Sequence, residues 1–144
     1  MLDARILIAE DDLFLQQIYR SSLEKQGYTV DVVTDGREAL AKLKASHWDL
    51  LLLDLNMPEV TGFDVLEAMR KDGSIVTTPV IVLTNFSEEE HGKRCMELGA
   101  RAFYTKSNFK FEEILSQVKT LNHERVTSTS SKKAAEAPAV AVTP

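Results

Sequence analysis

The chain has 144 residues, of which 44% are hydrophobic, and its formal net charge is −5. This length suits one domain with a single core, and the acidic balance argues against direct contact with nucleic acid, which needs clustered Lys and Arg. The single cysteine, Cys95, excludes an intramolecular disulfide. Since no basic segment followed by a long apolar stretch opens the chain, we expect a cytoplasmic protein that does not insert into a membrane.

Short apolar runs alternate with helical patterns, which predicts an α/β fold of roughly five βα units around a parallel sheet covered on both faces. The predicted strands include Arg5–Ala9, Leu50–Leu53, Pro79–Leu83 and Ala102–Thr105. The predicted helices are Leu13–Gln26, Gly36–Ser46, Gly62–Lys71, Glu88–Leu98 and Lys110–Leu121.

The first predicted helix carries an apolar stripe that we expect to face the core, made of Leu15, Ile18, Tyr19, Ser22 and Leu23. Phe14 lies off this stripe, next to the acidic residues that precede the helix. It is therefore either a partly exposed packing residue or part of a docking surface for a partner helix.

Composition changes after Asn122, where Thr, Ser, Lys, Ala and Pro dominate. Such a segment cannot build a core. We therefore expect one domain over residues 1–122 and a flexible, disordered tail over residues 123–144. We expect His47, His91 and His123 to lie at the surface, because their spacing is not typical of metal ligands.

Acidic residues follow two of the predicted strands directly. Glu10, Asp11 and Asp12 come after the first strand, and Asp54 follows four consecutive leucines. The first three alone fit equally well with a solvated charge run in which Asp12 caps the next helix. If the strands are neighbours, the acids converge, and like charges about 4 Å apart repel by roughly 4 kcal/mol at an effective dielectric of about 20. Mg²⁺ would offset this repulsion, because carboxylate oxygens are its preferred ligands.

Two further strands end in groups that suit phosphate chemistry. Thr84 follows the strand Pro79–Leu83 and offers a hydroxyl donor, and Lys106 follows Ala102–Thr105 and offers a compact cation. Each residue alone is weak evidence, because a threonine or lysine after a strand is usually a turn or solvated residue. Since parallel strands deliver their carboxyl ends to one edge of a sheet, the whole set predicts a site at that edge.

Four features stand in a specific order along the chain: the acid pair Glu10-Asp11, the block Asp54-Leu55-Asn56-Met57-Pro58-Glu59-Val60-Thr61-Gly62, Thr84, and Gly99-Ala100 through Phe103 to Lys106. In these features the chain resembles the receiver domain of two-component response regulators, from about Arg5 to Leu121. The resemblance implies a stand-alone, single-domain receiver. It also implies a flavodoxin-like doubly wound fold with a five-stranded parallel sheet in the order 2-1-3-4-5.

The resemblance assigns roles in phosphoryl transfer. Asp54 is the expected phosphoryl acceptor, Thr84 and Lys106 are expected to bind the phosphoryl oxygens, and Phe103 is the aromatic residue expected to change rotamer on activation. In this family the receiver itself catalyses transfer from a phosphohistidine and hydrolysis of the aspartyl phosphate. It is not a metabolic enzyme.

The resemblance also assigns the ligands of Mg²⁺. Asp11 and Asp54 are the expected side-chain ligands, the Asn56 backbone carbonyl is the remaining protein ligand, and Glu10 acts beside the metal or through water.

The implied partners are a sensor histidine kinase or a histidine phosphotransfer protein, and Phe14 is expected to contribute to docking of that protein. Because only a short tail follows the receiver-like segment, we expect output through a downstream effector protein. The expected output face is made of the helix at 88–98, the strand at 102–105 and the helix at 110–121.

Two residues depart from the family pattern, Ser107 and Asn85. Ser107 replaces the usual proline after Lys106, so we expect this loop to differ, with a bond that is either trans or held cis under strain. Asn85 replaces a small residue after Thr84, so we expect it either to narrow access to Asp54, which would slow uptake from small phosphodonors, or to add a hydrogen bond to the phosphoryl group. Phe86, at a position that flanks the path of the attacking water in this family, would shield the acyl phosphate.

Two alternatives to the phosphorylated switch follow from the sequence. Asn85 and Ser107 make a receiver-like interaction module that never uses its phosphate conceivable. A haloacid-dehalogenase-type phosphatase would need a second aspartate two residues after the nucleophile, where this chain has Asn56. The retained acids, threonine and lysine favour the phosphorylated switch.

Overall fold

The computed structural model describes residues 4–107 and 110–121, which fall into two compact units, one ending before residue 110 and the other beginning there. The predicted tail, residues 123–144, lies outside the described residues, as does His123. The division of the chain into a receiver and a tail therefore stays a prediction.

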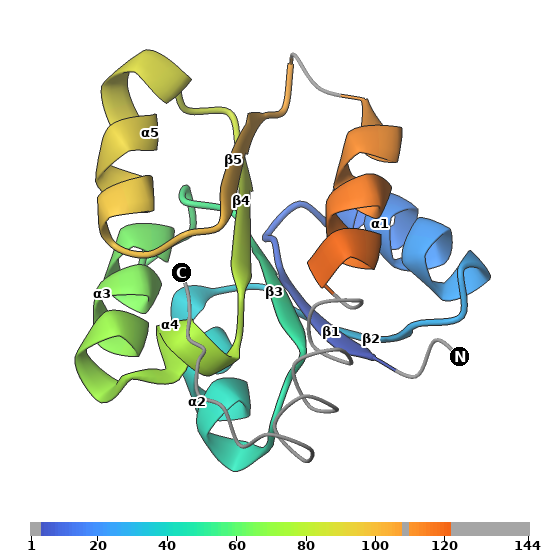
Figure 1. Ribbon diagram of the computed structural model, residues 1–144, viewed down its shortest axis with the longest axis horizontal. Coiled ribbons are helices and arrows are strands. Elements are labelled where there is room, and N and C mark those ends of the chain that lie inside the picture. Colours follow the sequence, from blue (N-terminus) through green and yellow to red (C-terminus); the bar gives the residue numbers. More distant parts are fainter. Residues whose placement is uncertain (1–3, 108–109, 122–144) are drawn as a thin grey trace, which may run out of the picture. The chain divides into compact units, whose positions relative to one another are not determined.

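Five parallel strands form one sheet in the first unit (Figure 1). The strands are β1 (Arg5–Ala9), β2 (Thr29–Val33), β3 (Leu50–Leu53), β4 (Val80–Thr84) and β5 (Ala102–Thr105). Their order is β2-β1-β3-β4-β5, which confirms the predicted doubly wound fold. Because β1 and β3 are neighbours, with Ala9 opposite Leu53, the residues that follow these two strands meet at one edge.

The helices of the first unit are α1 (Leu13–Lys25), α2 (Gly36–Ala45), α3 (Gly62–Asp72), α4 (Ser74–Thr77) and α5 (Glu88–Glu97). Four of them agree with the sequence-based ranges to within one residue at each end, and side-chain caps from Asp12, Asp35 and Thr61 begin the first three. The short α4 was not predicted. It follows Gly73, whose positive φ of 85° ends α3 in the left-handed conformation that glycine favours.

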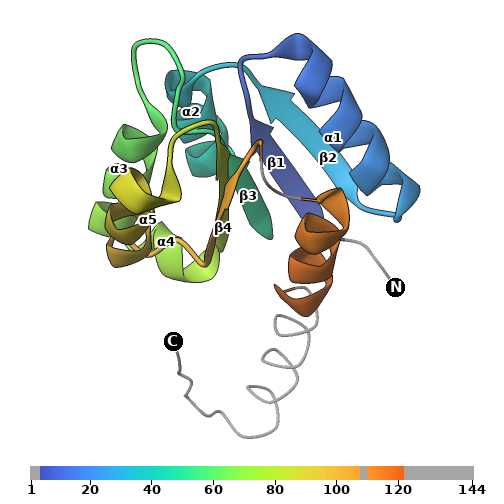
Figure 2. The same cartoon turned by 90° about the horizontal axis from the view of Figure 1, so that it is seen from above.

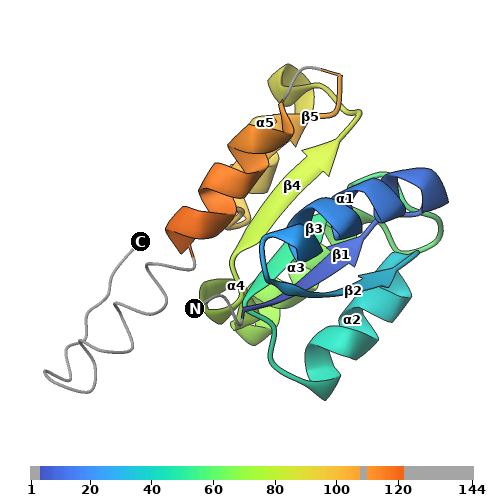
Figure 3. The same cartoon turned by 90° about the vertical axis from the view of Figure 1, so that its right-hand side faces the viewer.

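Helices cover both faces of the sheet (Figures 2 and 3). In these two views α2, α3 and α5 lie on one side of the strands and α1 on the other. The core on the side of α2, α3 and α5 includes Leu7, Ala9, Leu51, Leu53, Val80, Val82, Ala39, Val65, Leu66, Met69 and Cys95. The strands are therefore almost continuously apolar, as burial on both faces requires.

The buried face of α1 differs from the predicted stripe at two positions, Ile18 and Gln16. Tyr19 and Leu23 are buried, as expected, but Ile18 is 40% exposed. Gln16 is buried instead, because its side-chain amide donates a hydrogen bond to the Glu10 backbone carbonyl. A buried side-chain amide without a hydrogen-bond partner would destabilise the fold, and the Glu10 carbonyl supplies that partner.

The first turn of α3 lies directly against the backbone that carries Asp54. The Gly62 N–H donates to the Leu55 carbonyl at 3.0 Å. A Cβ atom at position 62 would lie 2.5 Å from the Asp54 carbonyl oxygen, so only glycine allows this close approach. The close packing of the first turn of α3 thus restrains the loop that follows β3.

In the second unit, residues 111–121 form a helix, which agrees with the predicted range of 110–121. Across the described parts of both units, no helix combines the length and apolar character needed to span a membrane.

Candidate functional site

The two acids that follow β1 and β3 are buried next to each other at the carboxyl edge of the sheet. Glu10 is 2% exposed and Asp54 is 4% exposed. Their backbones continue the strand pairing, since the Asp54 N–H donates to the Ala9 carbonyl at 3.0 Å and the Glu10 N–H donates to the Val33 carbonyl at 3.1 Å. The sheet itself therefore brings both carboxylates to the same place.

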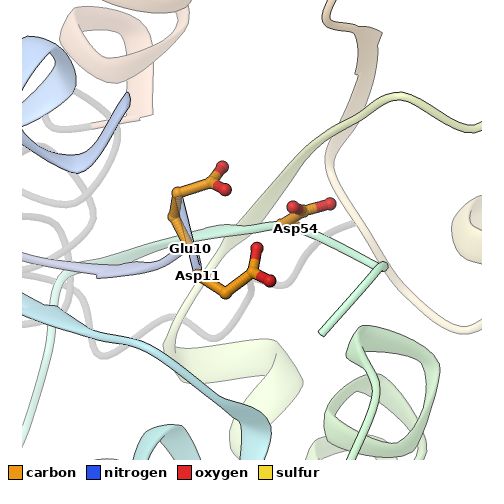
Figure 4. A group of neighbouring side chains, drawn as sticks. All are labelled: Glu10, Asp11 and Asp54. Atoms are coloured by element: carbon orange, nitrogen blue, oxygen red, sulfur yellow. The ribbon is translucent and has the colours of Figure 1, made fainter. Parts of the chain in front are cut away.

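Asp11 completes a cluster of three carboxylates with Glu10 and Asp54 (Figure 4). One oxygen of each lies within 4.8 Å of the others, and Asp11 is exposed. Asp12 is different: its Oδ1 accepts hydrogen bonds from the N–H groups of Phe14 and Leu15 at 2.9 and 3.1 Å, which caps α1. Asp12 thus caps α1, as one interpretation of the acidic run expected, whereas Glu10 and Asp11 converge with Asp54, as expected for neighbouring strands. Three convergent carboxylates with one open to solvent form a donor set that fits Mg²⁺.

Lys106 lies between the two buried acids. Its Nζ is 2.7 Å from Glu10 Oε1 and 3.0 Å from Asp54 Oδ2, and its side chain is 10% exposed. When both carboxyls are ionised, the single cation neutralises one of the two buried negative charges and the other remains uncompensated. This excess, together with exposed Asp11, makes the cluster attractive to a second positive charge.

Thr84 forms a hydrogen bond with Lys106, and Asn56 forms one with Asp54. Thr84, at the end of β4, is fully buried, its carbonyl accepts from the Lys106 N–H at 2.7 Å, and its Oγ1 accepts from the Phe86 N–H at 3.3 Å. The Asn56 N–H donates to Asp54 Oδ1 at 3.1 Å. Both oxygens of Asp54 are thereby held in place.

The fold and the grouped side chains agree with a family match. Residues 6–119 match the family model described as the response regulator receiver domain. The chain belongs to the response regulator receiver family.

Curated relatives of this receiver are longer proteins. The response regulator protein PmrA of Pseudomonas aeruginosa is 38% identical over 117 residues, which are 81% of this chain and 52% of PmrA. The transcriptional regulatory protein ResD of Bacillus subtilis is 33% identical over 119 residues, which are 83% of this chain and 48% of ResD. The chain thus spans about half the length of the curated relatives it matches.

Solved receiver structures have the same fold. A Francisella response regulator receiver domain aligns with a TM-score of 0.79 at 28% identity, covering 85% of this chain and 99% of that domain. The response regulator TrrA of Thermotoga maritima, in a complex with Mg²⁺-BeF, aligns with a TM-score of 0.72 at 30% identity, covering 82% of this chain and 98% of TrrA.

The structure shows where four residues singled out by the sequence analysis lie: Ser107, Asn85, Phe86 and Phe103. Within residues 4–107 every peptide bond is trans, including the bond from Lys106 to Ser107. Asn85 is exposed, and Phe86 is partly buried against the core. Phe103 lies on β5 opposite Val82 and packs partly buried against the same core. The rotamer change expected of Phe103 stays a prediction.

Phe14 is the most exposed aromatic side chain named by the sequence analysis, at 72%. Leu13, at 66%, and Ile18 are also exposed apolar residues of α1. Most of the Phe14 side chain is therefore open to solvent. It is the second residue of α1, the helix that Asp12 caps, and stands three positions after Asp11 in the sequence.

Two residues next to the carboxylate cluster, Gln16 and Tyr19, were not predicted to lie at the functional site. Gln16 holds the Glu10 carbonyl from α1, and buried Tyr19 lines the same small cavity as Glu10 and Asp54. Burial raises the pKa of Tyr19 to about 12. The positive charge of Lys106 acts against this rise, and the nearby carboxylates add to it. Positions 16, 19 and 23 are three and four residues apart, the spacing of residues on one face of a helix. The sequence therefore did contain a sign that Gln16 belongs to the buried face of α1.

Burial also controls the ionisation of Glu10. Removal from water raises its pKa from 4.5 to about 7, and repulsion from Asp54 adds to this, while the hydrogen bonds from Lys106 and the Asp12 N–H act in the opposite direction. The pKa of Lys106 is raised, because attraction to both carboxylates outweighs its own burial. Lys106 therefore stays charged, and Glu10 is the carboxyl that accepts a proton when no metal is bound.

We expect the free energy of unfolding of the metal-free receiver to fall as the pH rises from about 5 to about 8. Below pH 4.5 Glu10 is protonated in both states, but between 4.5 and about 7 only the folded state keeps the proton. Stability is thus lost across this window, by about 2 to 3 kcal/mol for a shift of this size. Chemical denaturation in a chelator, compared between wild type and Glu10→Gln, isolates this contribution.

The exposed variant Glu88→Gln serves as the matched control and should follow the wild-type pH dependence. Parallel curves for wild type and Glu10→Gln would show that Glu10 does not carry the shift. Addition of Mg²⁺ at about pH 8 should stabilise the wild type more than Glu10→Gln, because the bound cation favours the ionised carboxyl.

Proposed function

We propose that this receiver accepts a phosphoryl group on Asp54 from a phosphohistidine, in a reaction that needs Mg²⁺, and that the modification switches its contacts with an effector protein. The observation that carries the proposal is the placement of Asp54: its carboxylate is buried, one oxygen is next to Lys106, and it lies within 4.8 Å of two further carboxylates. The structure of TrrA with Mg²⁺-BeF supports the same chemistry in a similar receiver.

The proposed reaction forms a bond between a carboxylate oxygen of Asp54 and phosphorus. The P–N bond of the phosphohistidine breaks, and its electron pair returns to the imidazole. Lys106 and the Thr84 hydroxyl donate to the phosphoryl oxygens, so that developing charge meets fixed donors. Mg²⁺, when bound by Asp11, Asp54 and the Asn56 carbonyl with Glu10 acting through water, supplies charge neutralisation for the incoming group.

The product is an acyl phosphate, which water hydrolyses, so the signal has a limited lifetime. Once bonded to Asp54, the phosphoryl group draws Lys106 away from Glu10 and engages Thr84. Because Thr84 ends β4 and Phe103 lies on neighbouring β5, this movement shifts the packing at the surface of β5 and α5. We propose this surface as the part of the output face that lies in the first unit.

Incubation with acetyl phosphate or phosphoramidate, followed by intact-mass and peptide-mass analysis, tests the proposal. A phosphoryl adduct that requires Mg²⁺, maps to Asp54 and is lost on hydrolysis would support it. If neither donor gives an adduct, and beryllofluoride with Mg²⁺ leaves the NMR spectrum unchanged, the alternative of a phosphate-independent interaction module is favoured.

We further propose that Phe14 contributes to docking of the histidine kinase or phosphotransfer protein. Its side chain is exposed and apolar, and it stands three positions after Asp11 in the sequence, with exposed Leu13 beside it. A partner must deliver its phosphohistidine to Asp54, so its own surface has to contact residues around that site.

Phe14→Ala should slow transfer from a kinase that phosphorylates the wild type by about tenfold, because an exposed aromatic anchor contributes about 1 to 2 kcal/mol at such an interface. The rate with acetyl phosphate should stay unchanged, since the small donor needs no docking surface. Val76→Ala removes an equally exposed apolar side chain on α4 and is the matched control. Equal kinase rates for wild type and Phe14→Ala would exclude the docking role.

A further inference from the structure

Three aromatic rings from three segments stack beside the functional site. The His91 ring of α5 packs in a tilted arrangement against two rings, Phe63 in the first turn of α3 and Phe86 in the loop between β4 and α5. The ring centroids are 5.5 Å apart for Phe63 and His91 and 4.9 Å apart for Phe86 and His91. Both separations are favourable for aromatic pairs. We call these residues the Phe63–His91–Phe86 stack.

Both ends of the stack are tied to residues of the site. At one end, the Phe86 N–H donates to Thr84 Oγ1 at 3.3 Å. At the other end, Phe63 follows Gly62, whose close approach to the Asp54 carbonyl leaves no room for a Cβ atom. The stack therefore connects the loop that carries Thr84 with the helix that supports the Asp54 loop.

Phe63 has further support of its own. The Arg94 guanidinium lies 4.2 Å from the centre of the Phe63 ring, and Arg94 also pairs with Glu67 at 2.8 Å. Arg94 thus ties Phe63 on α3 to α5, the helix that carries His91. This contact restrains the pair of Phe63 and His91, and His91 in turn packs against Phe86.

The His91 side chain is only partly buried by its two ring contacts. It is 32% exposed, and its Nε2 lies 3.7 Å from the exposed carboxylate of Glu90. The sequence-based expectation of a surface histidine is therefore only partly met, because the ring packs against two phenylalanines and is only partly exposed.

We propose that His91 is a positioning residue for the reaction at Asp54, acting through Phe86 on the Thr84 hydroxyl. The proposal rests on the proposed function. The oxygen of Thr84 accepts from the Phe86 N–H, so its proton is left to donate to a phosphoryl oxygen. Stacking on His91 fixes the loop that carries this N–H, and a preorganised donor stabilises the transition state better than a mobile one.

A double-mutant cycle on the rate of phosphoryl uptake from acetyl phosphate tests this coupling. His91→Ala should slow uptake about two- to tenfold, the range that corresponds to the loss of one aromatic pair. In a Thr84→Ala background the same substitution should have almost no further effect, because the hydroxyl through which His91 acts is gone. Equal effects of His91→Ala in both backgrounds would overturn the proposal.

Rescue separates a positioning role from a general loss of stability. His91→Phe keeps a ring against the two phenylalanines and should restore the wild-type rate, whereas His91→Leu keeps volume without a ring and should not. His47→Ala removes an exposed histidine near the opposite edge of the sheet and is the matched control. A His91→Phe variant as slow as His91→Ala would contradict the proposal.

Amide hydrogen exchange provides a readout that does not depend on phosphorylation. The Phe86 amide should exchange faster in His91→Ala than in wild type or His91→Phe, because its hydrogen bond to Thr84 is less well held. If wild type forms the Asp54 adduct but neither the rate nor the exchange changes in His91→Ala, only this inference fails. If wild type forms no adduct, the proposed function fails with it.

Discussion

Asp54→Asn should abolish the phosphoryl adduct under conditions in which the wild-type receiver is modified. Asparagine keeps the shape of the side chain and an oxygen that accepts from the Asn56 N–H, so the loop after β3 retains its geometry. The amide is not a carboxylate nucleophile, and it contributes one negative charge less to the cluster with Glu10 and Asp11. Intact-mass analysis with acetyl phosphate and Mg²⁺ measures the loss.

The same substitution should raise the free energy of unfolding in a chelator. In the wild type, two buried carboxylates share the single cation of Lys106, whereas in Asp54→Asn only Glu10 remains to pair with it. Removal of one buried charge and of its repulsion stabilises the folded state by about 1 kcal/mol. Denaturation in the absence of metal checks this result and also shows that the variant is folded.

Asp72→Asn is the matched control, because Asp72 Oδ1 accepts from the Ser74 N–H in the same local pattern in which Asp54 Oδ1 accepts from Asn56. This exposed variant should be phosphorylated like the wild type. An adduct that persists in Asp54→Asn would place the acceptor elsewhere and would contradict the proposed function.

The sheet edge and its acids could be predicted from the sequence because local patterns determine them. Four leucines at 50–53 are compatible with a strand buried on both faces, and any side chain that follows such a strand emerges at the carboxyl edge. Asp12 could be identified as a cap for the same reason, since capping depends on residues two and three positions away. These features depend on short distances along the chain.

Other features depend on contacts between distant segments, which a periodic pattern does not contain. The exact buried face of α1 was one such case, where a hydrogen bond to the Glu10 carbonyl allows Gln16 to take an inward position and leaves Ile18 exposed. The sharing of Lys106 between Glu10 and Asp54 was another, because three separate strands must be assembled first. Helix α4 escaped prediction because four residues are too few to show a helical period.

Lys106→Met should slow phosphoryl uptake by about 10²- to 10³-fold, the usual effect of removing one fixed donor from developing transition-state charge. Methionine fills a similar volume but cannot donate to Asp54 Oδ2 or to a phosphoryl oxygen. The variant should also lose about 3 kcal/mol of unfolding free energy in a chelator near neutral pH, because Glu10 and Asp54 lose the cation between them.

The two effects of Lys106→Met should respond differently to Mg²⁺. A bound cation can replace the missing charge between the carboxylates, so saturating Mg²⁺ should recover most of the lost stability. It would not supply the hydrogen-bond donor that Lys106 offers to the phosphoryl oxygens, so uptake should remain slow. Lys93→Met, which changes a side chain that is 87% exposed, is the control and should alter neither quantity. If Mg²⁺ restored both stability and rate, Lys106 would be a charge-balancing residue that does not take part in the transfer itself.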